Sequence, residues 1–108
     1  MILSFDYVQY DSIAASSQNV LRATFKGLEQ DVLHDGRRIL LDSYISKISS
    51  MTEHRTYRDL ALNALTEAKD IADGGDKPTS RIKLEEAYYW CGKFIRLDTV
   101  KRLKGEIL

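Results

Sequence analysis

Apolar residues recur at steps of three, four and seven along most of the chain, which is the spacing of one helix face. In residues 11–35 they are Ala14, Leu21, Phe25, Leu28 and Val32. The spacing returns in residues 37–50 (Leu41, Tyr44, Ile45, Ile48), 52–73 (Tyr57, Ala61, Ala64, Ala68, Ile71) and 79–104 (Leu84, Ala87, Cys91, Phe94, Ile95). The pattern predicts an all-α fold, a small helical bundle.

Glycine and proline mark the breaks between these stretches. The segment GGDKPTS, residues 74–80, combines flexible glycines with a proline near a helix start and predicts a short loop. Two long helices joined by a short loop favour a long antiparallel helical hairpin. We therefore expect this hairpin to span residues 52–104, with Thr52 as its first cap.

The amino-terminal half is harder to divide. Residues 1–10 alternate loosely and predict an extended or irregular arm, and residues 11–50 are expected to form one or two helices. Asp11 or Ser12 is the expected first cap, and HDG, residues 34–36, is the expected stop. The 108 residues suit one domain, 1–108, whose small core would gain stability from self-association.

Several features point to the cytoplasm. The single cysteine, Cys91, excludes an internal disulfide and suits a reducing compartment. The start MILSFDYVQY lacks the basic residues and the apolar run of a signal peptide. No run of eighteen apolar residues is present. We expect a cytoplasmic protein that does not contact a membrane.

Charge is balanced over the whole chain but not along it. Residues 1–35 carry two basic and five acidic side chains, whereas residues 77–108 carry eight basic and four acidic ones. Attraction to duplex nucleic acid requires a stronger basic field than this, so no duplex partner is expected. A local site for a small anion and head-to-tail attraction between copies both remain open.

Catalytic and metal-binding motifs are not evident. The chain has no glycine-rich phosphate loop, zinc-ligand spacing or nucleophile elbow. His34 and His54 have no second ligand at a suitable spacing. Glu85 and Glu86 diverge by about 100° on a helix and cannot share a proton. We expect no catalytic residue, metal or cofactor. An enzyme whose site forms only on oligomerisation is a third hypothesis, after the two binding functions described below.

Charged residues at helical spacing predict surface pairs. Glu85 follows Arg81 by four residues and is expected to pair with it. Glu67 and Glu86 each precede an alanine of an apolar stripe, so they can approach each other across the hairpin. A solvated helix face is the favoured interpretation of these carboxylates.

Aromatic residues are concentrated in residues 80–95. Tyr88 and Cys91 share the apolar side and are expected in the core. Tyr89, Lys93 and Arg96 lie four and three residues apart on another face, where a ring can stack on a nucleobase and a cation can neutralise a phosphate. Tyr7 and Tyr10, followed by Arg22 and Lys26, offer the same combination.

Trp90 falls between these faces. If the hairpin buries only the apolar stripe of Leu84, a large apolar ring remains uncovered and favours a partner surface. Trp90 and Tyr89 are therefore the expected interface residues, most simply with another copy of the chain.

Residues 83–90 and Lys93, written K-L-x-E-A-x-x-W followed by lysine three residues later, resemble one protein family. These are the small helical phage proteins that sequester cyclic oligonucleotides, the anti-CBASS sponge proteins. The resemblance implies a cytoplasmic helical hairpin that forms homo-oligomers, typically hexamers, and binds cyclic di- or trinucleotides at subunit interfaces without cleaving them. It also implies ligand contacts from Tyr10 and Lys26, by order and approximate spacing.

Two functions follow as hypotheses. The first is a phage anti-defence protein that sequesters a cyclic nucleotide in the infected host cell, with Tyr10 stacking and with Lys26 and Arg22 neutralising phosphate; Lys93 and Arg96 are second choices. The alternative is a phage inhibitor that binds a host defence protein directly, in the manner of an anti-CRISPR protein. It would use Trp90, Tyr89 and the acidic first third of the chain.

Overall fold

The structure, a computed structural model, describes residues 7–34 and 38–107, with side chains described for residues 18–34 and 38–94. This part of the chain forms four helices and no strands: α1 (Tyr7–Leu33), α2 (Ile39–Ser49), α3 (Arg55–Asp73) and α4 (Lys77–Ile107). The all-α prediction is confirmed. Within the described residues, no helix is both long enough and apolar enough to cross a membrane.

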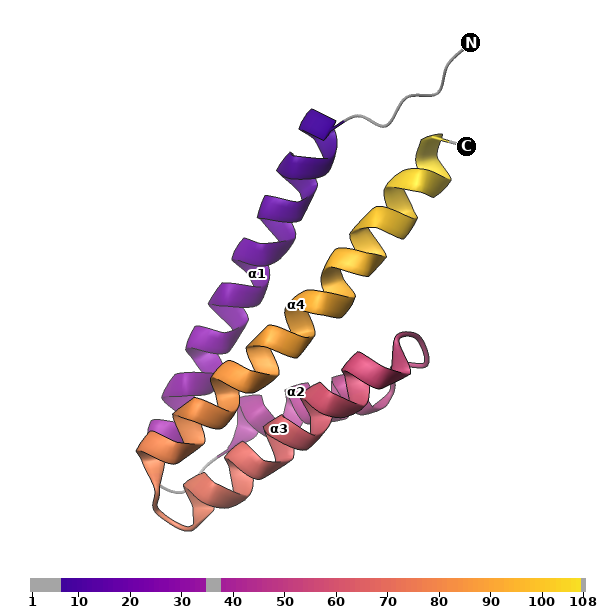
Figure 1. The fold of residues 1–108 in the computed structure, drawn as a ribbon. Helices are drawn as coiled ribbons and strands as arrows, with labels where there is room; N and C mark the ends of the chain where they lie inside the picture. Colours follow the sequence, from indigo (N-terminus) through magenta and orange to yellow (C-terminus); the bar gives the residue numbers. More distant parts are fainter. Residues whose placement is uncertain (1–6, 35–37, 108) are drawn as a thin grey trace.

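The two long helices, α1 and α4, lie side by side, and α2 and α3 lie together at an angle to them (Figure 1). Three contacts show that α1 and α4 run in opposite directions: Arg81 meets Glu29, Tyr88 meets Phe25, and Gly92 lies against the Gln18 side chain. The molecule measures 59 × 23 × 19 Å, and its long dimension follows this pair.

The predicted apolar faces meet in one core. Its buried members from α1 and α2 are Leu21, Phe25, Leu28, Val32, Leu41 and Ile48; those from α3 and α4 are Ala61, Ala64, Leu65, Ala68, Ala72, Leu84, Ala87, Cys91 and Phe94. The alanines of α3 let α4 approach closely, and the two helices also run in opposite directions. Lys83 Nζ of α4 lies 2.8 Å from Glu67 Oε2 of α3, and the Trp90 ring stacks on Tyr57.

Helix starts differ from the sequence predictions. The arm expected through Tyr10 is wrong, because α1 already begins at Tyr7; residues 1–6 lie outside the described part. Asp11 and Ser12 are therefore interior residues. An aspartate or serine inside a helix costs at most about 0.7 kcal/mol relative to alanine, which the packing of α1 against α4 can outweigh. Thr52 is not the cap of α3 either: that position is His54, which has a left-handed backbone (φ 54°).

The turn between α3 and α4 is fixed by two successive motifs. Gly75 has a positive φ of 93°, and the N–H groups of Gly75 and Asp76 donate to the carbonyls of Ala72 and Ile71. This arrangement is a Schellman motif, in which glycine avoids the steric cost of the left-handed conformation. Asp76 then caps α4 by accepting a hydrogen bond from Thr79 N–H at 3.2 Å. Helix α4 thus starts at Lys77, two residues before the predicted start.

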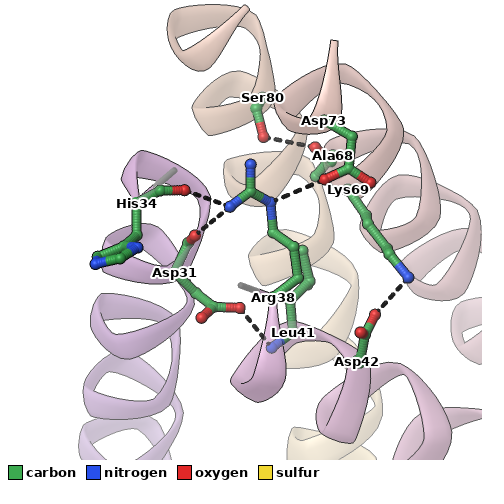
Figure 2. A network of polar contacts seen from close by, with 9 residues as sticks. All are labelled: Asp31, His34, Arg38, Leu41, Asp42, Ala68, Lys69, Asp73 and Ser80. Carbon is green, nitrogen blue, oxygen red and sulfur yellow. Dashed lines mark hydrogen bonds and ion pairs between the residues drawn. The ribbon is translucent and has the colours of Figure 1, made fainter. Parts of the chain in front are cut away.

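Arg38 ties three helix ends together at what we call the Arg38 corner (Figure 2). Its side chain is only 6% exposed; Nη1 donates to the carbonyls of Asp31 (3.0 Å) and His34 at the end of α1. Its Nε lies 3.2 Å from Asp73 Oδ1 at the end of α3, an ion pair without the alignment of a hydrogen bond.

Other polar contacts complete the Arg38 corner (Figure 2). Asp31 Oδ2 accepts a hydrogen bond from Leu41 N–H at 3.0 Å, so a carboxylate of α1 caps the first turn of α2. Lys69 of α3 pairs with Asp42 of α2 at 2.6 Å. The Ser80 hydroxyl donates to the Ala68 carbonyl at 2.6 Å inside the core. The corner therefore fixes how α2 and α3 sit against the long pair.

Candidate functional site

A groove of about 180 Å³ runs between α1 and α4. The buried residues of each helix face the other helices. The residues that follow them in the sequence lie beside the interface and form the groove walls. The lining residues are Arg22, Phe25, Lys26 and Glu29 from α1 and Arg81, Leu84, Glu85 and Tyr88 from α4. We refer to it as the α1–α4 groove. It brings three cations, two carboxylates and an aromatic ring together over an apolar floor.

The α1 wall carries the two cations that the sequence analysis selected on this helix. Arg22 and Lys26 are four residues apart, flanking the buried Phe25, so both project on the same exposed side. Within the part of the chain that the structure describes, neither has an ion pair or hydrogen bond. Both cations therefore remain available to a bound anion in the groove.

The α4 wall was not predicted as part of a site. Arg81 was expected to pair with Glu85, but its Nη2 lies 2.7 Å from Glu29 Oε1 of α1. Tyr88 was expected in the core; it is half-buried, lines the groove, and meets Phe25 edge to face, with the ring centroids 5.4 Å apart. An opposing carboxylate across the helix interface competes better than one on the same helix when it reaches the guanidinium in good geometry.

The sequence contained only part of the information needed to predict the α4 wall. Arg81, Glu85 and Tyr88 are spaced by four and three residues and therefore share one side of α4. Only the pairing of α1 with α4, which no local pattern reports, places that side opposite Arg22 and Lys26.

Tyr10 and Lys26 do not form one site within a single copy. Both belong to the continuous helix α1, sixteen residues apart, which corresponds to about 24 Å along the axis at 1.5 Å per residue. The side chains of Tyr10 and Arg96 lie outside the described residues. Of the five predicted ligand-binding residues, the structure brings Arg22 and Lys26 together.

Lys93 belongs to a separate aromatic cluster, made of Tyr57, Tyr89, Trp90 and Lys93. Its ammonium group lies 5.0 Å from the centre of the Tyr89 ring, a cation–π contact. Tyr89 meets Trp90 edge to face at 4.9 Å and is 55% exposed. Trp90 is half-buried, because its other side stacks on Tyr57 at 5.9 Å. Of the two predicted interface residues, Tyr89 is therefore the more exposed one.

Glu67 and Glu86 do come close to each other, as their spacing suggested, but a lysine separates them. Lys83 Nζ lies 2.8 Å from Glu67 Oε2 and 3.3 Å from Glu86 Oε2. These two carboxylates raise the pKa of Lys83. All three side chains are partly exposed, so the triad is a surface ion-pair network between α3 and α4.

Cys91 is buried, as expected, and is inert as a nucleophile. The Tyr44 hydroxyl donates to Cys91 Sγ at 3.7 Å. Burial raises the pKa of the Cys91 thiol to about 11, so it is protonated at neutral pH. Burial, followed by the neighbouring thiol, also raises the pKa of Tyr44. Among the described residues, no group of three or more His, Cys, Asp or Glu side chains is arranged to hold a metal ion.

Comparisons with models of protein families, with curated proteins and with solved structures find no match. The interpretation of the site consequently rests on its own geometry.

Proposed function

We propose that this protein is a non-catalytic binder of a cyclic oligonucleotide and acts by sequestering it. The observation that carries the proposal is a pair of cations, Arg22 and Lys26, that have no partner among the described residues and lie on one wall of a groove whose other wall presents Tyr88. Cations neutralise phosphate, and a half-buried ring offers a face or edge to a nucleobase. The resemblance of residues 83–93 to anti-CBASS sponge proteins supports the same ligand class.

Groove size suggests how much of the ligand one copy holds. At about 180 Å³, it is smaller than the roughly 300–1,000 Å³ pockets that enclose a whole small molecule. One groove suits a single base with its phosphate. We therefore propose that a homo-oligomer of α3–α4 hairpins, a hexamer by the resemblance, completes each site. In that oligomer Tyr10 comes from a neighbouring copy, since it lies too far from Lys26 of its own.

Sequestration requires only binding. The free concentration of the nucleotide falls when the protein is in excess and binds it more tightly than the effector that the nucleotide activates. No bond is broken, so no general base, nucleophile or metal is needed. In this proposal the protein works in the cytoplasm of a phage-infected cell and lowers an immune signal below its threshold.

The second candidate, an inhibitor that binds a host defence protein, is favoured by a different feature. In the aromatic cluster, Tyr89 is exposed beside the half-buried Trp90, and Lys93 covers the Tyr89 ring. Exposed aromatic rings held rigidly by neighbours are typical anchors of protein interfaces. The two candidates use different surfaces and can be separated by substitution.

Calorimetric titration of the protein with a panel of cyclic di- and trinucleotides tests the first candidate. We expect tight binding, recovery of the intact nucleotide after heat denaturation, and strong loss of affinity in Arg22→Gln/Lys26→Gln. Lys47→Gln is the matched control, since this exposed lysine lies on α2 outside the groove. No binding by any nucleotide would reject the proposal and direct attention to the aromatic cluster.

A further inference from the structure

Two stripes of side chains face each other across the α1–α4 groove, and their order is fixed. Arg22, Lys26 and Glu29 follow one another along α1, while Arg81, Glu85 and Tyr88 follow along α4 in the opposite direction. Glu29 is paired with Arg81 at one end, and Phe25 meets Tyr88 further along. Lys26 and Glu85 therefore lie between these two contacts, in the middle of the groove.

Glu85 differs from the other carboxylate of the groove. Glu29 is neutralised by Arg81 at 2.7 Å. Glu85 is exposed and has neither a hydrogen bond nor an ion pair to any described residue, and the arginine one turn before it on α4 is taken by Glu29. An unpaired carboxylate repels a simple polyanion. It is useful only to a ligand that carries hydrogen-bond donors as well as phosphate, since an ionised carboxylate is purely an acceptor.

We infer that Glu85 makes the α1–α4 groove select guanine among the nucleobases, an inference that rests on the proposed function. The Watson–Crick edge of guanine has two adjacent donors, N1–H and the N2 amino group, which match the two oxygens of one carboxylate. Adenine offers one amino donor beside the N1 acceptor, and that acceptor faces the carboxylate unfavourably. Cytosine has the same mismatch, and uracil has a single donor between two carbonyls.

The neighbours of Glu85 are consistent with a bound nucleotide. Tyr88 lies three residues further along the same side of α4, within reach of a base whose edge meets Glu85. Across the groove, Lys26 and Arg22 remain available for the phosphate. In this arrangement Glu85 meets the base edge, Tyr88 stacks on the base, and the two cations, which have no partner in the described part of the chain, neutralise the phosphate.

The test compares cyclic di-GMP with cyclic di-AMP as titrants of the wild type, Glu85→Gln and Glu86→Gln. The wild type should bind the guanine compound at least tenfold more tightly, because charged hydrogen bonds are among the stronger ones. Glu85→Gln should remove most of that ratio, since an amide presents one acceptor and a donor that opposes guanine. Glu86→Gln is the matched control: this neighbouring carboxylate faces Lys83 outside the groove, and the ratio should be unchanged.

The outcomes separate the inference from the proposed function. Binding of both compounds with a ratio that is near one, or that Glu85→Gln leaves unaltered, overturns the inference while the binding function stands. Binding of another cyclic nucleotide but of neither of these two also overturns the inference alone. No binding of any cyclic di- or trinucleotide by the wild type overturns both. Thermal unfolding of Glu85→Gln at the wild-type temperature excludes misfolding as the cause of a lost ratio, as expected for an exposed residue.

Discussion

The Arg38 corner and the α1–α4 groove both collect charged side chains between helices, but they use them differently. At the corner, a nearly buried guanidinium contacts two helix-end carbonyls and Asp73, so its charge is compensated by the fold. In the groove, Arg22, Lys26 and Glu85 have no described partner. In one small helical protein, charged side chains with partners in the fold therefore hold helices together, and those without a described partner are available to a ligand.

The largest effect should come from Arg38→Met. Removing the guanidinium leaves the Asp31 and His34 carbonyls without their donor and takes the ion-pair partner from Asp73, which is half exposed. Each acceptor left without its donor costs about 1 to 3 kcal/mol, so the free energy of unfolding should fall by about 3 kcal/mol. Urea denaturation measures the loss. Arg55→Met is the control: this arginine is exposed in the first turn of α3, and its replacement should change stability by less than about 0.5 kcal/mol.

Substitutions in the groove should weaken ligand binding and leave stability almost unchanged. Arg22→Gln/Lys26→Gln should weaken binding of a cyclic dinucleotide by about 100-fold, since each lost charged hydrogen bond contributes about 1.5 kcal/mol and tenfold equals about 1.4 kcal/mol. Its free energy of unfolding should stay within about 0.5 kcal/mol of the wild type. A destabilisation comparable to that of Arg38→Met would show that both regions are structural, and the comparison would break down.

The same contrast explains what the sequence could predict. Apolar spacing predicted the core faces of α1, α3 and α4, because a helix that buries one side must repeat every three or four residues. The sequence also singled out Arg22 and Lys26 as candidate phosphate ligands, and the structure brings these two together in one groove. It could not predict the opposite wall, because the register of Arg81 with Glu29 is set by tertiary packing between residues over fifty positions apart.

Helix ends were the least predictable features. Asp11, Ser12 and Thr52 are all good cap residues, yet α1 and α3 start at Tyr7 and Arg55. A cap contributes only about 1 kcal/mol, so long-range packing decides which candidate is used. Arg38 likewise gave no signal: a buried arginine is identified by its partners, and these come from α1 and α3.

A smaller effect tests the uncharged part of the corner. Ser80→Ala should lower the free energy of unfolding by about 1 kcal/mol, because the buried hydroxyl no longer donates to the Ala68 carbonyl. Ser46→Ala on the exposed side of α2 is the control for the gain in helix propensity that alanine brings. If both variants are equally stable relative to the wild type, the α3–α4 hydrogen bond contributes nothing, and the charged contacts alone hold the corner.

The smallest effect is a pH dependence at Asp76, another carboxylate whose charge is used by the fold. Hydrogen bonds from Thr79 lower the pKa of Asp76 below its ordinary 3.8, so the unfolded chain takes up the proton more readily than the folded one. The stabilisation is therefore complete above about pH 5 and is lost as the pH falls through 3.8 toward the lowered value.

Asp76→Asn keeps an oxygen that can cap α4 but cannot titrate. Its stability relative to the wild type should rise as the pH is lowered from 6 to about 2.5. Asp76→Ala, which has no cap at any pH, should be less stable than Asp76→Asn throughout, with a constant difference between the two. Urea midpoints across this range measure all three proteins. A wild type that keeps a constant advantage over Asp76→Asn would mean that the capping charge contributes nothing and that the cap acts through its hydrogen bond alone.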